Sequence, residues 1–297
     1  MKREKINIRD PYVLPVEEEG KYYLYGTRSA TTWGPADGLD CYVSEDLEEW
    51  EGPIEIYHKE EDSPFVCCYW APECYRMFGR YYLITTLGME GNRTGLYALE
   101  SDSPVGPFVR NEDSRLTPEA WKCIDGTLYQ DGDDLYLVFS RSFEDAPDGG
   151  DIWGIRLDTT GGRINGAAGE PFMLFDAKDA GWNEPIPFAK EFGIMDDVYL
   201  SDGPSLMKME DGSLVLLWSS WHHGSYAVGA AVSADGRIDG EWTHYPEPVW
   251  PENAGHGMIF TTFEGKRMYA LHYPNDKYKE APVFHDLDIV DGKIVIK

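Results

Sequence analysis

Residues 123–139 of the chain read CIDGTLYQDGDDLYLVF. A short strand leads into an Asp-Gly turn at 131–132 and a nearly all-apolar strand follows, which together are a strong signal for a β-hairpin. Asp125, in an Asp-Gly pair of its own, lies just upstream of the first strand. The stretch therefore predicts a hairpin with a carboxylate at its root.

The same pattern, a turn ending in glycine before a run of bulky residues, occurs at five places in the chain. The turns are Glu19-Gly20, Phe78-Gly79, Asp131-Gly132, Asp211-Gly212 and Glu264-Gly265. Successive turn glycines are 59, 53, 80 and 53 residues apart, and a period in the fifties with several short strands per unit is typical of a β-propeller. We therefore predict an all-β fold in which residues 1–297 form a single five-bladed β-propeller domain. The wide third spacing predicts a long extra loop within 143–198, and residues 293–297 are expected to form the last strand.

The charge of the chain limits its partners. There are 53 acidic and 26 basic residues, which give a formal net charge of −27. Such an excess disfavours nucleic acid, anionic membrane surfaces and polyanionic polymers, because binding them requires clusters of Lys and Arg. No segment is long and apolar enough to predict a membrane span. A small neutral oligosaccharide is the expected partner, and the sequence carries no signal for an oligomeric state.

The cysteines and the first residues indicate a compartment. Cys41, Cys67, Cys68, Cys74 and Cys123 are odd in number and lack zinc-ligand spacing. We therefore expect reduced, mostly buried thiols, which fits a cytoplasmic protein. The charged start of the sequence has no apolar segment after it, so no signal peptide is expected.

One polar residue precedes each hairpin turn at a similar offset. Asp10, Glu73, Asp125, Asp202 and His256 lie 10, 6, 7, 10 and 9 residues before their turn glycines. Equivalent offsets in equivalent blades place these residues at the start of the innermost strands, beside the central channel. The sequence therefore predicts that they converge on one cavity.

Three aspartates in one pocket suggest glycoside hydrolysis. One carboxyl protonates the leaving oxygen, and a second, ionised, activates water or attacks the sugar. A third can hold the pKa values of its neighbours apart by like-charge repulsion. The alternative for each Asp is a turn residue that hydrogen-bonds its own backbone.

Several short motifs, in order and spacing, resemble those of glycoside hydrolase family 43. They are Arg9-Asp10-Pro11, Trp70-Ala71-Pro72-Glu73, Ser103-Pro104-Val105-Gly106-Pro107-Phe108, Ile124-Asp125-Gly126 and Gly255-His256-Gly257. The resemblance implies a five-bladed propeller that hydrolyses arabinose- or xylose-containing glycans with inversion. It implies that Asp10 is the general base, Asp202 the general acid and Asp125 the residue that modulates their pKa values. It also places His256 near a central Ca²⁺ or water cluster found in some members, with no cofactor required for the reaction.

The acid position departs from the family pattern. The family usually has Glu-Gly-Pro, whereas this chain has Asp202-Gly203-Pro204. The carboxyl of Asp lies about 1.5 Å further back, and a misplacement of that size can cost about 10²-fold in rate. Glu184 in the third unit is a candidate substitute acid. A sugar-binding propeller without turnover is the non-catalytic alternative.

A second enzyme class shares part of the pattern. In the fructan-hydrolase clan, Arg-Asp-Pro and Glu-Cys motifs recur, and Arg9-Asp10-Pro11 and Glu73-Cys74 are similar to them. That clan also needs an upstream nucleophile motif, for which the residues before Arg9 leave no room. We therefore favour the family 43 interpretation.

Further residues are candidates for substrate binding. Trp33, Trp70 and Trp221 are expected to offer flat faces to a sugar ring, with core packing as the alternative. Arg28 and Arg141 are expected at the channel rim, where they bind sugar hydroxyls or form surface salt bridges. Glu73 belongs to the same group, and His256 is the candidate metal ligand. The predicted function is an inverting hydrolase of neutral pentose glycosides, namely α-L-arabinofuranosides or β-D-xylosides of plant cell-wall oligosaccharides.

Overall fold

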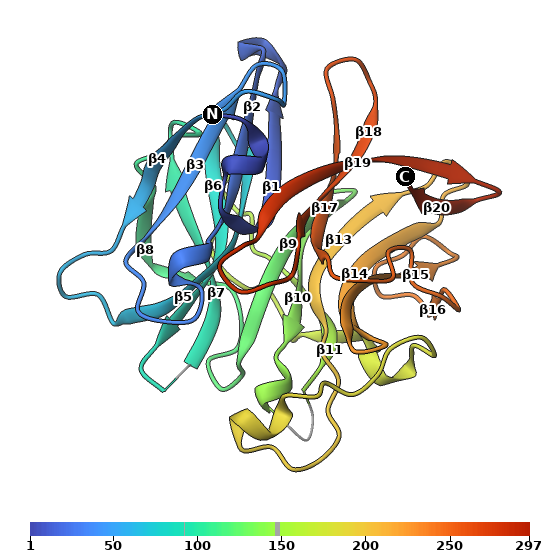
Figure 1. Ribbon diagram of the computed structural model, residues 1–297. Helices are drawn as coiled ribbons and strands as arrows, with labels where there is room; N and C mark the ends of the chain where they lie inside the picture. The colour runs from blue at the N-terminus through green and yellow to red at the C-terminus, as the bar shows by residue number, and fades with distance from the viewer. Residues whose placement is uncertain (92, 146–148) are drawn as a thin grey trace.

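The computed structural model describes residues 1–91, 93–145 and 149–297, and within these ranges 20 strands form five four-stranded antiparallel sheets (Figure 1). Each sheet is one blade made of four consecutive strands, which confirms the predicted five-bladed β-propeller. Residues 146–148 of the predicted loop lie outside the described residues. Among the described residues, no helix is long and apolar enough to cross a membrane.

The strands of the blades follow one another along the chain. Blade one contains β1 (Ile8–Val16), β2 (Lys21–Arg28), β3 (Gly38–Ser44) and β4 (Glu51–His58). Blade two contains β5 (Phe65–Met77), β6 (Arg80–Met89), β7 (Arg93–Ser101) and β8 (Val109–Arg115). Blade three contains β9 (Cys123–Asp131), β10 (Asp134–Arg141), β11 (Asp151–Arg156) and β12 (Phe172–Asp176).

The last two blades have the same construction. Blade four contains β13 (Asp202–Lys208), β14 (Leu214–His222), β15 (Ser225–Ser233) and β16 (Trp242–His244). Blade five contains β17 (Gly255–Thr261), β18 (Arg267–Tyr273), β19 (Ala281–Val290) and β20 (Lys293–Ile296), so the predicted last strand is confirmed. Short 3-10 helices connect some of these strands: η1 (Arg3–Lys5), η2 (Glu17–Glu19), η3 (Ser29–Thr31), η4 (Phe143–Asp145), η5 (Ala177–Asp179) and η6 (Ala189–Phe192).

The predicted turns join the first and second strands of the blades. Their glycines all have positive φ, from 60° at Gly132 to 88° at Gly212, a conformation that glycine adopts without steric cost. The bulky runs after the turns form the second strands, and each contributes fully buried side chains: Leu24, Leu83, Leu137, Leu216 and Leu271. Burying a leucine stabilises the fold by about 1.5–3 kcal/mol, so the repeated pattern builds the core between the sheets.

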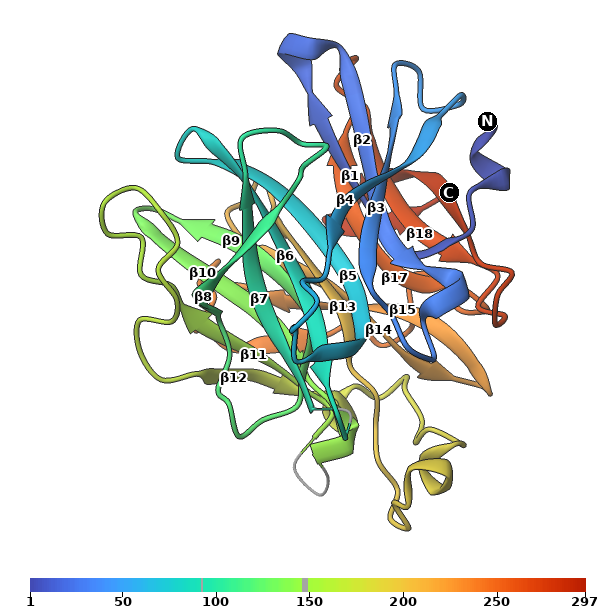
Figure 2. The same cartoon turned by 90° about the vertical axis from the view of Figure 1, so that its left-hand side faces the viewer.

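The expected long loop connects blades three and four. Residues 177–201 run from the end of β12 to the start of β13 and contain η5 and η6. In Figures 1 and 2 this yellow segment extends from the lower end of the molecule. It supplies Phe188, Phe192 and Leu200 to the cavity described below.

Side chains join the first blade to the last. In both views the dark-blue β1 runs beside the red strands of blade five (Figures 1 and 2). Glu280 is fully buried there and accepts hydrogen bonds from Arg9 Nη1 (2.9 Å) and Ser29 Oγ (2.7 Å). Asn7 Nδ2 donates to the Glu280 carbonyl oxygen at 2.8 Å. Removing one partner of a buried ion pair typically costs about 3–5 kcal/mol, so Arg9 also stabilises ring closure.

Candidate active site

The candidate site lies where the first strands of the blades meet. β1, β5, β9, β13 and β17 contact one another in a ring around the centre of the propeller. In each of these strands, the pairing with the second strand slips at the same point. In blade one the register moves from Arg9 to Tyr12, so Asp10 and Pro11 together face a single residue of β2. This arrangement is a β-bulge, which re-aims the side chain of the bulged residue.

The other blades carry the same bulge. It consists of Ala71-Pro72, Asp125-Gly126, Gly203-Pro204 and His256-Gly257. The first bulge residue always has a positive φ: 54° at Asp10, 46° at Ala71, 56° at Asp125, 49° at Gly203 and 44° at His256. For a residue with a side chain this conformation costs roughly 1–3 kcal/mol, and it persists only where the surroundings fix it. The second residue is Pro or Gly, which suits a position without a ladder partner.

This register corrects one inference from the sequence. Asp10, Asp125 and His256 occupy equivalent positions, as predicted. Asp202, however, precedes its bulge by one residue, and Glu73 comes two residues after Ala71. Offsets counted from the turn glycines failed here because the hairpins between bulge and turn differ in length from blade to blade.

Polar side chains of the second strands hold the bulges in place across blade boundaries. Thr27 Oγ1 accepts the Ala71 N–H at 2.8 Å, and Thr86 Oγ1 accepts the Asp125 N–H at 3.1 Å. Ser219 Oγ accepts the His256 N–H at 2.8 Å. Each acceptor pairs, in its own blade, with the residue before the bulge. The strained backbone is therefore fixed by the neighbouring blade.

The remaining two boundaries use site residues themselves. His272 Nδ1 accepts the Asp10 N–H at 3.3 Å, so the proton of this neutral ring lies on Nε2, which faces Asn275 Oδ1 at 3.2 Å. Burial, together with the nearby Arg9 cation, holds the pKa of His272 well below its usual value. Between blades three and four, Asp125 Oδ2 accepts the Gly203 N–H at 3.4 Å.

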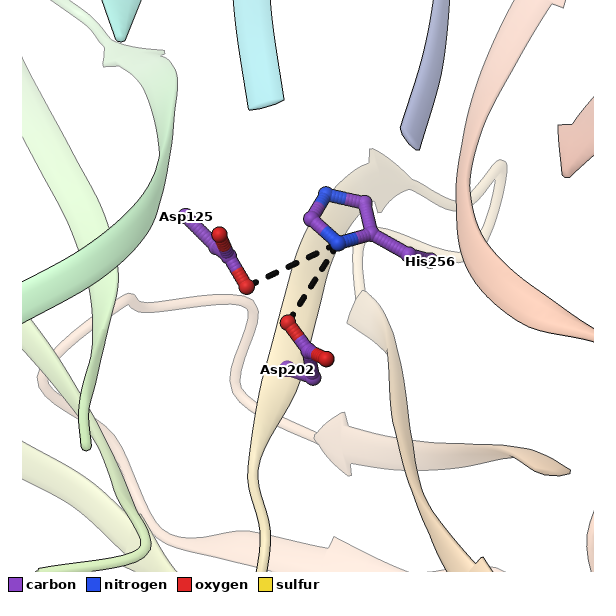
Figure 3. A group of neighbouring side chains, drawn as sticks. All are labelled: Asp125, Asp202 and His256. Atoms are coloured by element: carbon purple, nitrogen blue, oxygen red, sulfur yellow. Dashed lines mark ion pairs between the residues drawn. The ribbon is translucent and has the colours of Figure 1, made fainter. Parts of the chain in front are cut away.

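His256 lies between the three aspartates. Its Nδ1 is 3.3 Å from Asp10 Oδ1, 3.3 Å from Asp202 Oδ1 and 3.6 Å from Asp125 Oδ2. Figure 3 shows the carboxyl groups of Asp125 and Asp202 directed at this same ring nitrogen. Burial opposes a charge on His256, but the carboxylates of Asp10 and Asp202 outweigh it and raise the pKa of the imidazole. The structure thus brings together the four polar residues that the sequence predicted for catalysis and the channel centre.

The two outer carboxylates have different partners. Asp10 Oδ2 accepts a 2.6 Å hydrogen bond from Thr27 Oγ1, and its side chain is 8% exposed. Asp202 Oδ2 accepts a 2.7 Å hydrogen bond from the Tyr226 hydroxyl, and its side chain is 16% exposed. The Tyr226 ring stacks on His272, with centroids 5.7 Å apart. Thr27 therefore holds Asp10, which is the more buried of the two, and Tyr226 holds Asp202.

Sequence reasoning missed Thr27, His272 and Tyr226. The first two pair with the residue before a bulge, so the bulge register would have found them. Nothing in the sequence marks Tyr226, which reaches the site from the third strand of blade four, β15.

A cavity of about 440 Å³ opens beside the carboxylates. This is within the ~300–1,000 Å³ typical of small-molecule sites. Asp10, Asp125, Asp202 and His256 contribute to its lining. The predicted aromatic platforms also line it, together with aromatic side chains from the long loop and its surroundings: Trp33, Trp70, Trp221, Phe143, Phe188, Phe192 and Tyr226. Flat apolar walls around a polar centre suit a sugar ring, which presents C–H faces and hydroxyl edges.

Three residues predicted to bind substrate lie outside this lining. Arg28 forms a salt bridge to Asp40 at 2.6 Å, and Arg141 forms one to Asp145 at 3.0 Å. Glu73 is buried and accepts a hydrogen bond from the Tyr75 hydroxyl; burial raises its pKa to about 7. The cavity lining therefore gives no support to the substrate-binding assignments of Arg28, Arg141 and Glu73. The two arginines instead follow the salt-bridge alternative.

Glu184 does not fit the role of a substitute acid. It is exposed, outside the cavity lining, and 3.1 Å from His223 Nδ1. The hydrogen bond with His223 lowers the pKa of Glu184, whereas a general acid needs a raised one.

The centre also offers donors for a metal ion. One atom each of Asp125, Asp202 and His256 lies within 4.8 Å of the others. Two carboxylates and one imidazole could hold a cation whose remaining ligands are water molecules. Such an ion would displace the proton shared between His256 and the carboxylates, because a metal-bound imidazole nitrogen is deprotonated.

Comparison with known proteins agrees with this geometry. The family described as glycosyl hydrolases family 43 matches residues 5–287. An endo-arabinase from Bacteroides thetaiotaomicron is similar in structure, with 33% sequence identity, a TM-score of 0.87, and 99% of this chain and 98% of that chain covered. An endo-1,4-beta-xylanase from the same organism is 26% identical, with a TM-score of 0.76 and coverages of 99% and 95%. An alpha-L-arabinofuranosidase from Lactobacillus brevis is 16% identical, with a TM-score of 0.71 and coverages of 100% and 97%, which shows the shared fold alone. No curated protein sequence matches the chain.

Proposed function

Because the chain belongs to glycosyl hydrolases family 43, we propose that it is an inverting glycosidase that acts on short, neutral pentose glycosides. The observation that carries this proposal is that Asp10 and Asp202, which both contact His256 Nδ1, line one aromatic cavity. The net charge of −27 also favours an uncharged substrate.

The geometry suits a general-base role for one carboxyl group and a general-acid role for the other. Asp10, ionised and held by Thr27, accepts the proton of the water that attacks the anomeric carbon. Asp202, in its protonated form, donates to the leaving oxygen, and Tyr226 orients its carboxyl group. Asp125 links the two through its contacts with His256 and with the Gly203 N–H. Its negative charge and the positive charge of His256 set the electrostatic balance of the pair.

The carboxyl separation bears on the stereochemistry. The Oδ1 atoms of Asp10 and Asp202 each lie 3.3 Å from His256 Nδ1, so they are no farther apart than twice that distance, ~6.6 Å. Inverting enzymes hold their carboxyl groups about 6.5–9.5 Å apart and retaining enzymes about 5–5.5 Å apart. Because the upper bound falls at the short end of the inverting range, the product anomer is the decisive measurement.

Pentose specificity is supported by two of the similar solved structures, the endo-arabinase at 33% identity and the endo-1,4-beta-xylanase at 26%. The higher identity belongs to the arabinase, so α-L-arabinofuranosides are the first substrates to test and β-D-xylosides the second. We further propose that hydrolysis needs no metal, because the carboxylates of Asp10 and Asp202 raise the pKa of His256 and thereby favour a positive charge between them. A cation held by Asp125, Asp202 and His256 would supply the same charge. Activity that survives prolonged EDTA treatment would support the metal-free reaction.

The test is a panel of aryl α-L-arabinofuranoside, β-D-xyloside and β-D-galactoside, with arabino- and xylo-oligosaccharides as natural substrates. We expect turnover of a pentoside that is at least tenfold faster than that of the galactoside. NMR during the first minutes should show the inverted anomer. A retained anomer would contradict the roles assigned to Asp10 and Asp202, and a preference for the galactoside would contradict the pentose specificity.

A non-catalytic, sugar-binding propeller is the second candidate. The observation that favours it is the Asp at the acid position, one methylene shorter than the family's usual Glu. Binding of arabino- or xylo-oligosaccharides by calorimetry, without turnover of any glycoside in the panel, would decide for this alternative.

A further inference from the structure

Two consecutive cysteines form part of the cavity wall. Cys67 and Cys68, in β5, both line the pocket beside Trp70 and Ile124. The Cys68 thiol donates to Cys67 Sγ, and the two sulfur atoms are 3.1 Å apart. A disulfide bond is about 2.05 Å long. The sulfurs therefore need to approach by only about 1 Å to bond.

The backbone places both side chains on the same side of the strand. Neighbouring residues of a regular strand point to opposite faces. Here the register slips after Cys67, which pairs with Gly88, and Cys68 has a φ of 58°. Gly88 leaves the space that the pair occupies, because a Cβ there would lie 2.8 Å from Cys67 Sγ and from Cys68 Cβ. The juxtaposition thus depends on a local irregularity and on a glycine opposite it.

The two thiols differ in reactivity. The hydrogen bond from Cys68 lowers the pKa of Cys67 to about 7, although burial opposes this shift. The same hydrogen bond, together with burial, raises the pKa of Cys68. Cys67 is partly exposed, whereas Cys68 is 3% exposed. An accessible thiolate beside a second sulfur is the arrangement in which oxidation proceeds to a disulfide and stops there.

We propose that Cys67 and Cys68 are a redox-active vicinal dithiol, which hydrogen peroxide or an organic peroxide converts to a disulfide in the pocket wall. The Cys67 thiolate attacks a peroxide oxygen, so that an S–O bond forms, the O–O bond breaks, and water or an alcohol leaves after taking up a proton. Cys68 sulfur, losing its proton, then attacks Cys67 sulfur; the S–S bond forms and the S–O bond breaks with release of water. The two sulfurs are oxidised by two electrons in total, and the peroxide is reduced.

The resulting bond is expected to be reversible. Adjacent Cα atoms are ~3.8 Å apart, whereas disulfides usually join Cα atoms ~4.4–6.8 Å apart. A strained disulfide is readily reduced by other thiols. This chemistry is independent of which sugar the pocket takes and of whether the protein turns one over.

The test uses the full chain and one equivalent of hydrogen peroxide. We expect a mass loss of about 2 Da, and a fall in maleimide-reactive thiols, counted after unfolding in denaturant, from the five cysteines of the sequence to three. Peptide mapping should place the bond between Cys67 and Cys68, and dithiothreitol should restore the thiols. Cys41→Ala, which removes a buried thiol elsewhere, should leave the reaction unchanged. Cys68→Ser should instead yield a dimedone-reactive sulfenic acid on Cys67 with no mass loss.

Phenylarsine oxide, which bridges two neighbouring thiols, gives a second measurement. The parent protein should bind one equivalent that resists washing with a monothiol, and Cys68→Ser should not. Three results would overturn the proposal: a disulfide between other cysteines, a Cys68→Ser protein that reacts like the parent, or five unreacted thiols where a cysteine peptide in the same tube is oxidised. Because mass and mapping are read on the parent protein, a variant that fails to fold leaves the test intact.

Discussion

In blade one the bulge residue Asp10 carries the carboxylate, whereas in blade four the bulge residue is Gly203 and the carboxylate belongs to Asp202, one position earlier. The backbone slip is the same in both blades. The difference changes the partner of the carboxyl group, which Thr27 holds in blade one and Tyr226 holds in blade four.

The neighbouring blade explains why blade four needs a glycine. A Cβ on Gly203 would lie 2.7 Å from the His256 ring, so a side chain at this position would occupy the place of the imidazole. His256 in turn bridges Asp10 and Asp202. A repeated backbone therefore yields two carboxylates with different surroundings by a shift of a single residue, which an acid and a base require.

The largest expected effect is that of Asp10→Ala. If Asp10 is the base, its loss should lower kcat/KM by about 10³–10⁴-fold. The loss should be similar for natural oligosaccharides and for a dinitrophenyl glycoside, because water must be activated whatever group departs. Kinetics on both substrates provide the check. A variant that keeps dinitrophenyl glycoside hydrolysis near the parent rate would assign the base to another residue.

Asp202→Ala should separate the two substrates. A leaving group that needs no protonation compensates for the loss of the general acid, but it does not compensate for the loss of the general base. We expect a fall of about 10²–10³-fold on natural oligosaccharides and less than about tenfold on the dinitrophenyl glycoside. Equal losses of activity on both substrates would show that Asp202 in blade four and Asp10 in blade one do not differ as acid and base. Unchanged activity on natural substrates would show that Asp202 is not the acid.

Asp125→Asn is expected to have an intermediate effect. Asp125 sits at the equivalent bulge of blade three and touches both His256 and the Gly203 N–H, so it couples the two regions. We expect kcat to fall by about 10²-fold, with a displaced pH–rate profile and an unchanged melting temperature. A profile that only scales down, without moving, would show that Asp125 positions Gly203 and has no electrostatic role.

The repeat made the architecture predictable from the sequence. The five glycine turns, the buried second strands and the extra loop before blade four were read from spacing alone, because a repeated unit must place its apolar residues in the same way each time. Asp10, Asp125 and His256 were found for the same reason.

The position of Asp202 relative to its bulge could not be predicted, since a one-residue slip does not change the spacing of the hairpin turns. The sequence did not reveal that Arg28 and Arg141 form salt bridges with Asp40 and Asp145, because carboxylates 12 and 4 residues away pair only where the fold turns the two side chains toward each other. Tyr226 could not be identified because it reaches Asp202 from β15, which β14 separates from β13 in the sheet, and no local pattern encodes that approach.

The smallest effect, and the sharpest comparison, comes from the hydroxyl groups that hold the two carboxylates. Tyr226→Phe removes the donor to Asp202, and Thr27→Val removes the donor to Asp10 together with the acceptor of the Ala71 N–H. A hydrogen bond to an ionised carboxylate is worth about 1.5–3 kcal/mol and one to a neutral carboxyl group about 0.5–1.5 kcal/mol, so Thr27→Val should lose roughly 10–100-fold in kcat on natural substrates and Tyr226→Phe roughly 2–10-fold. Tyr226→Phe should be largely rescued by the dinitrophenyl glycoside and should keep the parent's melting temperature, because it acts only through Asp202 at the pocket. Thr27→Val should not be rescued by the dinitrophenyl glycoside and should melt at a lower temperature, because it also releases the strained bulge of blade two.

If both variants gave the same ratio of activities on the two substrates, the two carboxylates would have the same role. The one-residue shift between the blades would then affect packing alone.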